Sequence, residues 1–435
     1  MHSPRPWSAP ARGSEVTSQA APGPARLDGL VGRVRDLGRR LESPTTTYHL
    51  LIGTTSVLLV VGLFMVLSAS TVQSLTETDS ASAYREFYKQ LVFAGVGVVG
   101  LLIASRTPVR VIRGLAGLAF GVSVALQCLV FSPLGVDALG NRNWIGIAGV
   151  TLQPSEVLKL GLILLGAVIL TRKSRVLNQP GHILVPFVVP VAAVSIGLVL
   201  LGHDLGTTLV LAAIVAGMLF VAGVPGRYFT ISIAGLAALA TVMVVTSPNR
   251  LQRFDVWLGN DKDIWGAARQ PMHGRFALAD GGWLGVGLGA SREKWGFLSE
   301  PHNDFIFAII GEELGLLGTL AILALFGVLA YACCRLVTRT TDSFVRLATA
   351  GILCWILAQT MINIGSVIGL LPVIGVPLPL VSSGGSSLIM TLIALGVLLS
   401  FARREDGCAE ALRARPSVIR RSVSVIPRRR GKGSR

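Results

Sequence analysis

The chain has 435 residues, of which 51% are hydrophobic and only 14% are charged. This composition is too apolar for an ordinary soluble globular protein. The formal net charge of +16 invites a nucleic-acid interpretation. Basic tails that follow the positive-inside rule and lie against anionic lipid explain the charge better, so no nucleic-acid partner is expected.

The two ends of the chain are polar and basic. Residues 1–48 are rich in Pro, Ser, Ala and Arg and are predicted to form a disordered N-terminal tail. Residues 403–435 are predicted to form a second disordered tail, in which eleven basic residues stand against three acidic ones. No cleavable signal peptide is visible, because the first apolar run starts only after the polar N-terminal tail.

Residues 49–402 contain recurrent apolar runs, and about 20 apolar residues are needed to cross a bilayer as a helix. The sequence therefore predicts an all-α polytopic membrane protein with about ten transmembrane helices, nine or eleven being the alternative counts. The predicted spans are His49–Val72, Gln90–Ser105, Val109–Phe131, Val157–Thr171, Ile183–Leu201, Leu205–Gly223, Tyr228–Thr246, Phe305–Cys334, Leu347–Leu371 and Leu380–Ala402.

The short connections between alternate spans are basic, namely Arg106–Arg113, Arg172–Arg175, Gly226–Arg227 and Arg335–Arg346. The positive-inside rule places these connections, and with them both termini, in the cytoplasm. We therefore expect a multi-pass protein of the bacterial inner or plasma membrane.

One long polar loop, residues 247–303, interrupts the apolar spans and is predicted to be extracytoplasmic. It holds four of the seven tryptophans: Trp257, Trp265, Trp283 and Trp295. It also gathers acids, bases and amides up to the start of the next span: Asp255, Asp261, Asp263, Arg269, Gln270, His273, Arg275, Lys294, Glu300, His302 and Asp304. A long loop of this composition, held between apolar helices, is suited to a surface active site.

Charges at membrane depth are costly unless they are paired or hydrated, so each is a functional candidate. The first group joins Arg142 and Trp144 to Glu156 and Lys159 at a predicted helix start. Glu156 and Lys159 are three residues apart and can pair on one helix face. A structural ion pair at the helix entrance is the alternative to a substrate-binding role.

Further acidic residues stand where two other spans begin. Asp204 precedes a span and is expected to cap it, unless it binds a ligand. Asp304 is likewise expected to be a helix N-cap. Glu312 and Glu313 lie two turns inside the next span, where neither side chain reaches the surface easily.

The last predicted span is preceded by a serine–glycine run, residues 382–387. Small residues of this kind predict a broken or closely packed helix start, because they allow backbones to approach. A phosphate cradle is the weaker interpretation of the same run.

Several uncommon strings occur in one order along the chain, and they resemble the SEDS family (shape, elongation, division and sporulation), the group of FtsW and RodA. The resemblance runs from about Val66 to Ala402, and the Val-Leu-Ser-Ala-Ser string with the extended tails favours the division branch. The strings are Arg142-Asn143-Trp144-Ile145, Gln153-Pro154-Ser155-Glu156, Asp204-Leu205-Gly206-Thr207, Asp304–Gly315, Pro377-Leu378-Pro379 and Gly384-Gly385-Ser386-Ser387.

The resemblance implies a ten-helix fold and a peptidoglycan glycosyltransferase that polymerises lipid II. The implied partners are a class B penicillin-binding protein transpeptidase and other divisome or elongasome proteins. In the family the long loop carries an Asp-Pro-x-Gly-x-Gly-Tyr-Gln motif whose aspartate is proposed to be catalytic. The matching stretch here is Asp263–Gln270, so the role transfers to Asp263, while Ile264 and Ala268-Arg269 depart from the motif. His203, Ser299 and Ser383 depart from the family pattern elsewhere.

The implied reaction needs a base for a sugar hydroxyl and positive charge for a departing lipid pyrophosphate. A general base contributes typically about 10²–10⁴-fold, and Asp263 is the candidate. The positive charge could come from Arg142, Lys159 and Arg269, or from a divalent cation such as Mg or Mn; no protein metal site is assigned. The candidate substrate-binding residues are Arg142, Trp144, Glu156, Lys159, Asp204, Gln270, Asp304 and Glu312.

Two other functions fit the same residues. A lipid II flippase would use Glu156, Lys159, Glu312 and Glu313 to line a pathway, and a non-catalytic scaffold would only hold a transpeptidase. Small residues on the spans Phe305–Cys334 and Leu347–Leu371 allow a partner helix to pack there: Gly315, Gly318, Gly327, Ala348 and Gly351. The same residues equally allow packing inside the bundle.

Overall fold

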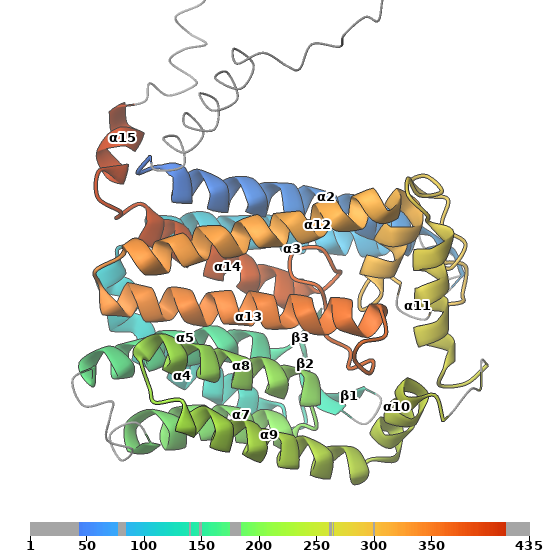
Figure 1. Cartoon of the computed structure of the whole chain (residues 1–435), viewed down its shortest axis with the longest axis horizontal. Helices are drawn as coiled ribbons and strands as arrows, with labels where there is room; N and C mark the ends of the chain where they lie inside the picture. Colours follow the sequence, from blue (N-terminus) through green and yellow to red (C-terminus); the bar gives the residue numbers. More distant parts are fainter. Residues whose placement is uncertain are drawn as a thin grey trace, which may run out of the picture.

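The computed structural model describes residues 43–76, 84–138, 141–147, 150–174, 184–260, 263, 265–298 and 301–414. Long, roughly parallel helices form a bundle, with α15 at one end and α10 and α11 at the other (Figure 1). Most of the two tails predicted to be disordered lies outside the described residues. The described part of the second tail contains a short helix, α15 (Cys408–Ala414), which the sequence analysis did not predict.

Each of the ten predicted spans has a helical counterpart. Eight described helices are long and apolar enough to cross a membrane, and η1 with α7, a shorter apolar segment, and α9 account for the other two predicted spans. The helices are α2 (Thr46–Thr76), α3 (Arg85–Arg106), α4 (Val109–Leu129), α5 (Pro154–Arg172), η1 (Leu184–Ala193), α7 (Val194–Leu201), α8 (Leu205–Ala222), α9 (Arg227–Val245), α12 (Ile306–Arg339), α13 (Ser343–Val367) and α14 (Gly385–Ala402).

The centre of the bundle is formed by α5, α13 and α14, which are the most enclosed of the eight candidate spans. Their glycines allow this close packing. A Cβ atom at Gly161 would lie 2.7 Å from Ser123 Oγ, and one at Gly385 would lie 2.6 Å from the Phe93 ring. The serine–glycine run is therefore a closely packed helix start, as predicted.

The first and last described residues meet at one end of the bundle, which we call the tail end. Arg335 Nε donates to Thr47 Oγ1 at 2.9 Å, and the Arg403 guanidinium lies over the Tyr48 ring at 5.3 Å. The opposite end, which we call the loop end, carries the two helices of the long loop: α10 (Pro248–Leu258) and α11 (Arg269–Asp280).

A small antiparallel sheet at the loop end was not predicted. Its strands are β1 (Gly135–Ala138), β2 (Asn141–Ile147) and β3 (Val150–Leu152), in the order β1-β2-β3. Val136 lies opposite Trp144 in this ladder. The Arg142 backbone N–H donates to Gly202 O at 3.0 Å, which ties the sheet to the junction of α7 and α8.

The connection between α13 and α14 corrects two predicted boundaries. Both spans were predicted to extend into residues 368–384, but α13 ends at Val367 and α14 begins at Gly385. Left-handed φ angles at Gly369 and Gly375 turn the chain between the helices. Asn363 Nδ2 holds this segment by donating to Val376 O at 2.8 Å and to Asp304 O at 2.9 Å.

Helix α12 is broken at Gly315, which has φ 68° and ψ −165°. The long loop fills the break. Val286 N–H donates to Glu312 O at 2.9 Å, and Leu316 N–H donates to Gly282 O at 2.9 Å, so backbone groups freed by the break are satisfied. A Cβ atom at Gly285 would lie 2.2 Å from Glu313 O, which explains the glycine at that position.

Candidate active site

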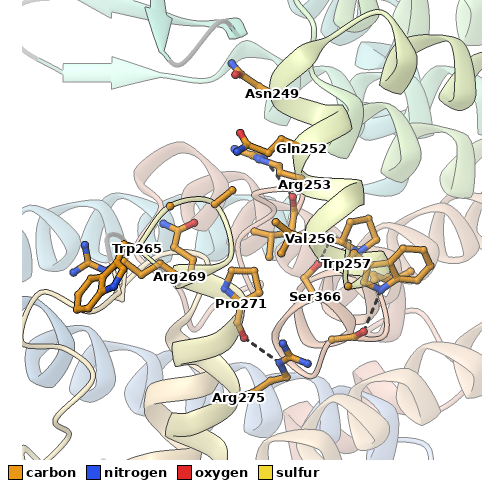
Figure 2. Close-up of a pocket in the computed structure, with 18 residues that line it drawn as sticks. Asn249, Gln252, Arg253, Val256, Trp257, Trp265, Arg269, Pro271, Arg275 and Ser366 are labelled. Atoms are coloured by element: carbon orange, nitrogen blue, oxygen red, sulfur yellow. Dashed lines mark hydrogen bonds between the residues drawn. The ribbon is translucent and has the colours of Figure 1, made fainter. Parts of the chain in front are cut away.

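A cavity of about 530 Å³ opens at the loop end between α10, α11 and the segment after α13. Figure 2 shows Asn249, Gln252 and Arg253 entering it from α10, with Trp265 and Arg269 on the opposite side. The cavity is lined by Asn249, Gln252, Arg253, Val256, Trp257, Gly259, Trp265, Gly266, Ala267, Arg269, Gln270, Pro271, Arg275, Ser366, Gly369, Leu371, Pro372 and Val373. We call it the arginine cavity.

The described lining of the arginine cavity contains three guanidinium groups and no carboxylate. Arg253, Arg269 and Arg275 donate to the backbone carbonyls of Val373, Gly296 and Pro271, respectively. Within the described ranges none of the three forms an ion pair, and no acidic residue lines the cavity. Such a surface suits a phosphate or pyrophosphate group, because guanidinium groups bind these oxygens strongly.

Asp263 lies exposed at the edge of this cavity, next to its lining residues Trp265 and Gly266. Its Oδ1 accepts the Trp265 backbone N–H at 3.0 Å. A Cβ atom at Gly266 would lie 2.6 Å from Asp263 Oδ2, so a larger residue there would displace the carboxylate from this position. Two other predicted positions, Asp261 and Ile264, lie outside the described residues.

A second, smaller cavity of about 110 Å³ adjoins the first and contains Asp204. The two cavities are neighbours, because Asn249, Arg253, Pro372 and Val373 line both. Besides Asp204, the smaller cavity is lined by Asn141, His203 and Arg250.

Asp204 is the N-cap of α8, as the capping interpretation predicted. Its Oδ1 accepts Thr207 N–H at 2.8 Å, and its Oδ2 accepts the Thr207 hydroxyl at 2.7 Å. Gln153 Nε2 also donates to Oδ2, at 3.2 Å. Asp204 therefore joins the start of α5 to the wall of the smaller cavity.

The residues around Asp204 are strained and partly desolvated. His203 has a left-handed φ of 63°, a conformation closed to the proline that the family pattern has there. Its carbonyl accepts Arg250 Nη2 at 2.6 Å. Burial lowers the pKa of Arg250, and the nearby Asp204 carboxylate opposes that change.

Asp304 is not the N-cap that the sequence suggested. Helix α12 begins at Ile306, and its N-cap is Phe305, which makes no side-chain cap. Asp304 lies half-buried beside Gly375, where its Oδ2 would be 3.3 Å from a Cβ atom. Burial raises the pKa of Asp304 to about 6, although the positive charge of Arg253 acts against the rise.

Glu156 and Lys159 form the predicted ion pair, with 2.8 Å between Lys159 Nζ and Glu156 Oε1. Both side chains are almost completely buried in the centre of the bundle. The ammonium group also lies 4.9 Å from the centre of the Trp355 ring. The pair touches neither cavity wall, but Gln153, one turn earlier, connects its helix to Asp204.

Arg142 and Trp144 lie on β2 and not in the arginine cavity. Arg142 Nη2 donates to Ser132 O at 2.9 Å, which holds the guanidinium against the turn before β1. Its neighbour Asn141 reaches the smaller cavity. Of the predicted binding residues, the structure thus places only Gln270 and Asp204 in the described lining of the two adjoining cavities.

Glu312 and Glu313 attach the long loop to the bundle. Glu312 accepts the Ser291 hydroxyl at 2.5 Å and the Arg292 backbone N–H at 2.7 Å, one with each oxygen. Glu313 accepts the Ser68 hydroxyl at 2.7 Å and pairs with Lys294 at 3.1 Å. These contacts give both buried carboxylates a role in positioning the loop.

A histidine–glutamate pair holds α11 against the same loop. His273 Nδ1 lies 2.6 Å from Glu293 Oε2, and its ring stacks on Phe297 with 5.0 Å between centroids. Burial raises the pKa of Glu293, and the His273 hydrogen bond acts in the opposite direction. Because α11 carries Arg269, Gln270 and Arg275, this contact helps to place the wall of the arginine cavity.

Sequence reasoning missed Arg253, which lines both cavities, and the segment after α13. A signal for the first was available: Asn249, Arg253 and Val256 follow helical spacing, so they share one face of α10. No helix was predicted within residues 247–303.

The sequence matches the "Cell cycle protein" family of FtsW, RodA and SpoVE over residues 48–407. It is 40% identical to a probable peptidoglycan glycosyltransferase FtsW of Mycobacterium tuberculosis over 93% of this chain and 77% of the relative. It is 36% identical to the stage V sporulation protein E of Bacillus subtilis over 81% of this chain and 96% of the relative.

Solved structures with the same fold include a chain of a peptidoglycan synthase complex that coordinates polymerization and crosslinking. That chain is 27% identical with a TM-score of 0.66, over 82% of this chain and 97% of its own length. The rod shape determining protein RodA of Thermus thermophilus is also 27% identical, with a TM-score of 0.60 over 82% and 96% of the two chains. The chain is a multi-pass membrane protein that belongs to the FtsW/RodA/SpoVE family.

Proposed function

We propose that this chain polymerises lipid II at the loop end of the bundle, with Asp263 as general base and the arginine cavity as the site of the lipid pyrophosphate. Its FtsW relatives are named as peptidoglycan glycosyltransferases, which supports the enzyme class. The assignment of substrate and residues to this chain is our proposal.

The observation that carries the proposal is the juxtaposition of Asp263 with an unpaired cationic cavity. Arg253 and Arg269 enter the cavity from opposite walls, and Asp263 lies at its edge beside Trp265 and Gly266. The candidate base and the candidate leaving-group site are thus adjacent but distinct parts of one surface. Glycosyl transfer needs this separation, because the base acts on the attacking hydroxyl and the cations act on the departing group.

In the proposed step, the 4-hydroxyl of one sugar attacks the anomeric carbon of another. The Asp263 carboxylate accepts the hydroxyl proton as the new C–O bond forms and the bond to the lipid pyrophosphate breaks. The pyrophosphate leaves as an anion that Arg253, Arg269 and Arg275 stabilise. The amide of Gln270 supplies polar contacts to the same group.

Among the described residues, no three or more His, Cys, Asp or Glu side chains form a candidate metal group. A Mg or Mn ion commonly binds through one or two carboxylates and the phosphates of a substrate, so we propose that such an ion binds together with the lipid pyrophosphate. Chelation by EDTA in the polymerisation assay tests this proposal.

We further propose that the loop end faces the outside of the cell and that both termini are cytoplasmic. The basic connections at the tail end support this orientation. Protease added to intact spheroplasts should cut the long loop and spare tags placed at either terminus.

A class B penicillin-binding protein is the proposed partner, supported by the likeness to a chain of a peptidoglycan synthase complex. Of the glycines considered for its docking, Gly351 packs inside the bundle, since a Cβ atom there would lie 2.9 Å from Ile163. Gly327 on α12 has open space beside it and remains available for a partner helix.

The contacts of the four residues proposed to line a flippase pathway favour a role in holding the fold together. Glu156 pairs with Lys159, Glu312 bonds the loop backbone, and Glu313 pairs with Lys294. Incubation of the purified chain and its transpeptidase with labelled lipid II distinguishes the functions. Glycan strands support our proposal, transbilayer movement alone supports a flippase, and neither product supports a scaffold.

A further inference from the structure

One segment of the long loop exposes its large apolar side chains. Residues Trp283, Leu284 and Leu288 are 73%, 77% and 69% exposed. Positive φ angles at Gly282, Gly285, Gly287 and Gly289 turn the backbone of this segment. We call Trp283–Leu288 the apolar finger.

The apolar finger is hydrogen-bonded to α12 at a defined level along the helix axis. Trp283 O accepts the Leu317 N–H at 3.3 Å, and Gly282 O accepts the Leu316 N–H at 2.9 Å. A Cβ atom at Gly315 would lie 2.7 Å from Leu284 N. The finger therefore lies beside Gly315–Leu317 of α12.

The same height marks the point where α12 begins to expose apolar side chains. Residues Ile306–Glu313 are all buried, whereas Leu316 and Leu317 are exposed. Exposed apolar residues then continue along the helix as far as Tyr331. The lipid-facing surface of α12 thus starts at Leu316.

Helix length gives an independent measure of this boundary. Arg335 and Arg339 mark the tail end of α12. At 1.5 Å per residue, the helix rises roughly 30 Å from Leu316 to Arg335, which is about the thickness of the hydrocarbon core. The loop-side edge of the hydrocarbon core therefore falls at the residues that the apolar finger contacts.

We propose that the apolar finger inserts into the bilayer interface at the loop side, as a membrane contact of the long loop beside α12. The Trp283 ring lies at headgroup level, where tryptophans are enriched, and Leu284 and Leu288 bury their side chains against acyl chains. Continuity with the exposed face of α12 identifies the bilayer as the occupant. This contact does not depend on the proposed catalytic chemistry.

Tryptophan quenching in vesicles tests the proposal. The full chain, its Trp283→Phe variant and its Trp265→Phe variant are reconstituted in phosphatidylcholine–phosphatidylglycerol vesicles, with and without lipids brominated near the headgroup. Trp265 is the matched control, since it is 80% exposed and lines the arginine cavity. The fluorescence of Trp283 is the difference between the emission of the native chain and that of Trp283→Phe, and it should be quenched mostly by brominated lipid. The fluorescence of Trp265, obtained in the same way, should be quenched mainly by aqueous iodide.

Two results would overturn the proposal. Quenching of the Trp283 emission by iodide and not by brominated lipid places the finger in water. If brominated lipid does not quench the Trp283 emission, and a purified single-span transpeptidase is needed to shield it from iodide, the finger is a protein-docking surface.

A charge in the finger gives a second test. Leu284→Asp should shift the Trp283 emission to longer wavelength and remove its quenching by brominated lipid. Leu258→Asp, at an exposed position on α10 outside the finger, is the control and should leave the Trp283 emission unchanged. An unchanged spectrum in Leu284→Asp contradicts insertion.

Discussion

Charged side chains occupy two contrasting settings in this molecule. Lys159 pairs with Glu156 inside the bundle, and Lys294 of the long loop pairs with Glu313 of α12; all four side chains are buried. In the arginine cavity, Arg253, Arg269 and Arg275 donate to backbone carbonyls, and no carboxylate is among the described residues of the cavity lining.

The contrast separates positioning from binding. A charge inside an apolar span is tolerated only when a partner neutralises it, so such a charge serves to position the helices and is not available to bind a substrate. A cation in an open polar cavity retains its hydration and its charge until an anion displaces the water. Charge at membrane depth is therefore a weaker sign of a substrate pathway here than charge in the loop.

The loss of Asp263 should have the largest effect. Asp263→Asn keeps the size and polarity of the side chain but removes its basicity, so polymerisation should fall at least about 100-fold with expression unchanged. Labelled glycan strands measure the rate. Asp255→Asn, on α10 and outside the cavity lining, is the control. If Asp263→Asn is active and Asp255→Asn is inactive, Asp263 is not the general base.

Breaking the buried ion pair should have the largest effect on stability. Lys159→Met leaves the Glu156 carboxylate without its cation, which costs about 3–5 kcal/mol of unfolding free energy. Glu156→Gln combined with Lys159→Met removes both charges and should recover much of that loss. Thermal unfolding in detergent measures both variants. Strictly additive losses would show that the pair is not coupled.

Glu313→Gln tests the attachment of the loop. The variant loses the ion pair with Lys294 and weakens the Ser68 bond, at a cost of roughly 1–3 kcal/mol. Local opening should accelerate hydrogen exchange at Val286 and Gly287, whose amides bond to α12. Glu86→Gln, in the exposed pair with Lys89, is the matched control and should leave those amides protected. Equal exchange in both variants contradicts the positioning role.

Asp304 should give a smaller and pH-dependent effect. Burial raises the pKa of Asp304 to about 6, so the folded protein binds its proton more tightly than the unfolded chain. The associated stability is present below about pH 4 and is lost as pH rises through about 6. Asp304→Asn should therefore be more stable than the native chain at pH 7, by on the order of 1–3 kcal/mol, and similar at pH 4. A difference that does not change with pH excludes this titration.

The sequence predicted the parts of the fold that depend on local composition. Each predicted apolar run corresponds to helical structure, and eight of the described helices are long and apolar enough to cross a membrane. The three-residue spacing paired Glu156 with Lys159, and the position of Asp204 before a span predicted its capping bond. These features arise within one helix or at its end. Residue type and spacing are therefore sufficient to predict most of these local features.

The features that were missed depend on contacts between distant segments. Residues 368–384 are apolar enough to extend two helices, yet Asn363 and two glycines hold them as an irregular cavity wall. The break at Gly315 is stabilised by a loop some thirty residues earlier in the chain. Asp304 was expected to cap α12, but the first turn of the helix begins one residue later, after Phe305.

The central claim is that the arginine cavity binds the lipid pyrophosphate while Asp263 performs the chemistry. Equilibrium binding of labelled lipid II to three purified proteins tests it directly: the native chain, Asp263→Asn, and Arg253→Gln with Arg269→Gln. Loss of two charged contacts should weaken binding by at least roughly 10-fold. We expect this loss in the arginine variant and near-native affinity in Asp263→Asn. Native affinity in the arginine variant, with binding lost in Asp263→Asn, would contradict it.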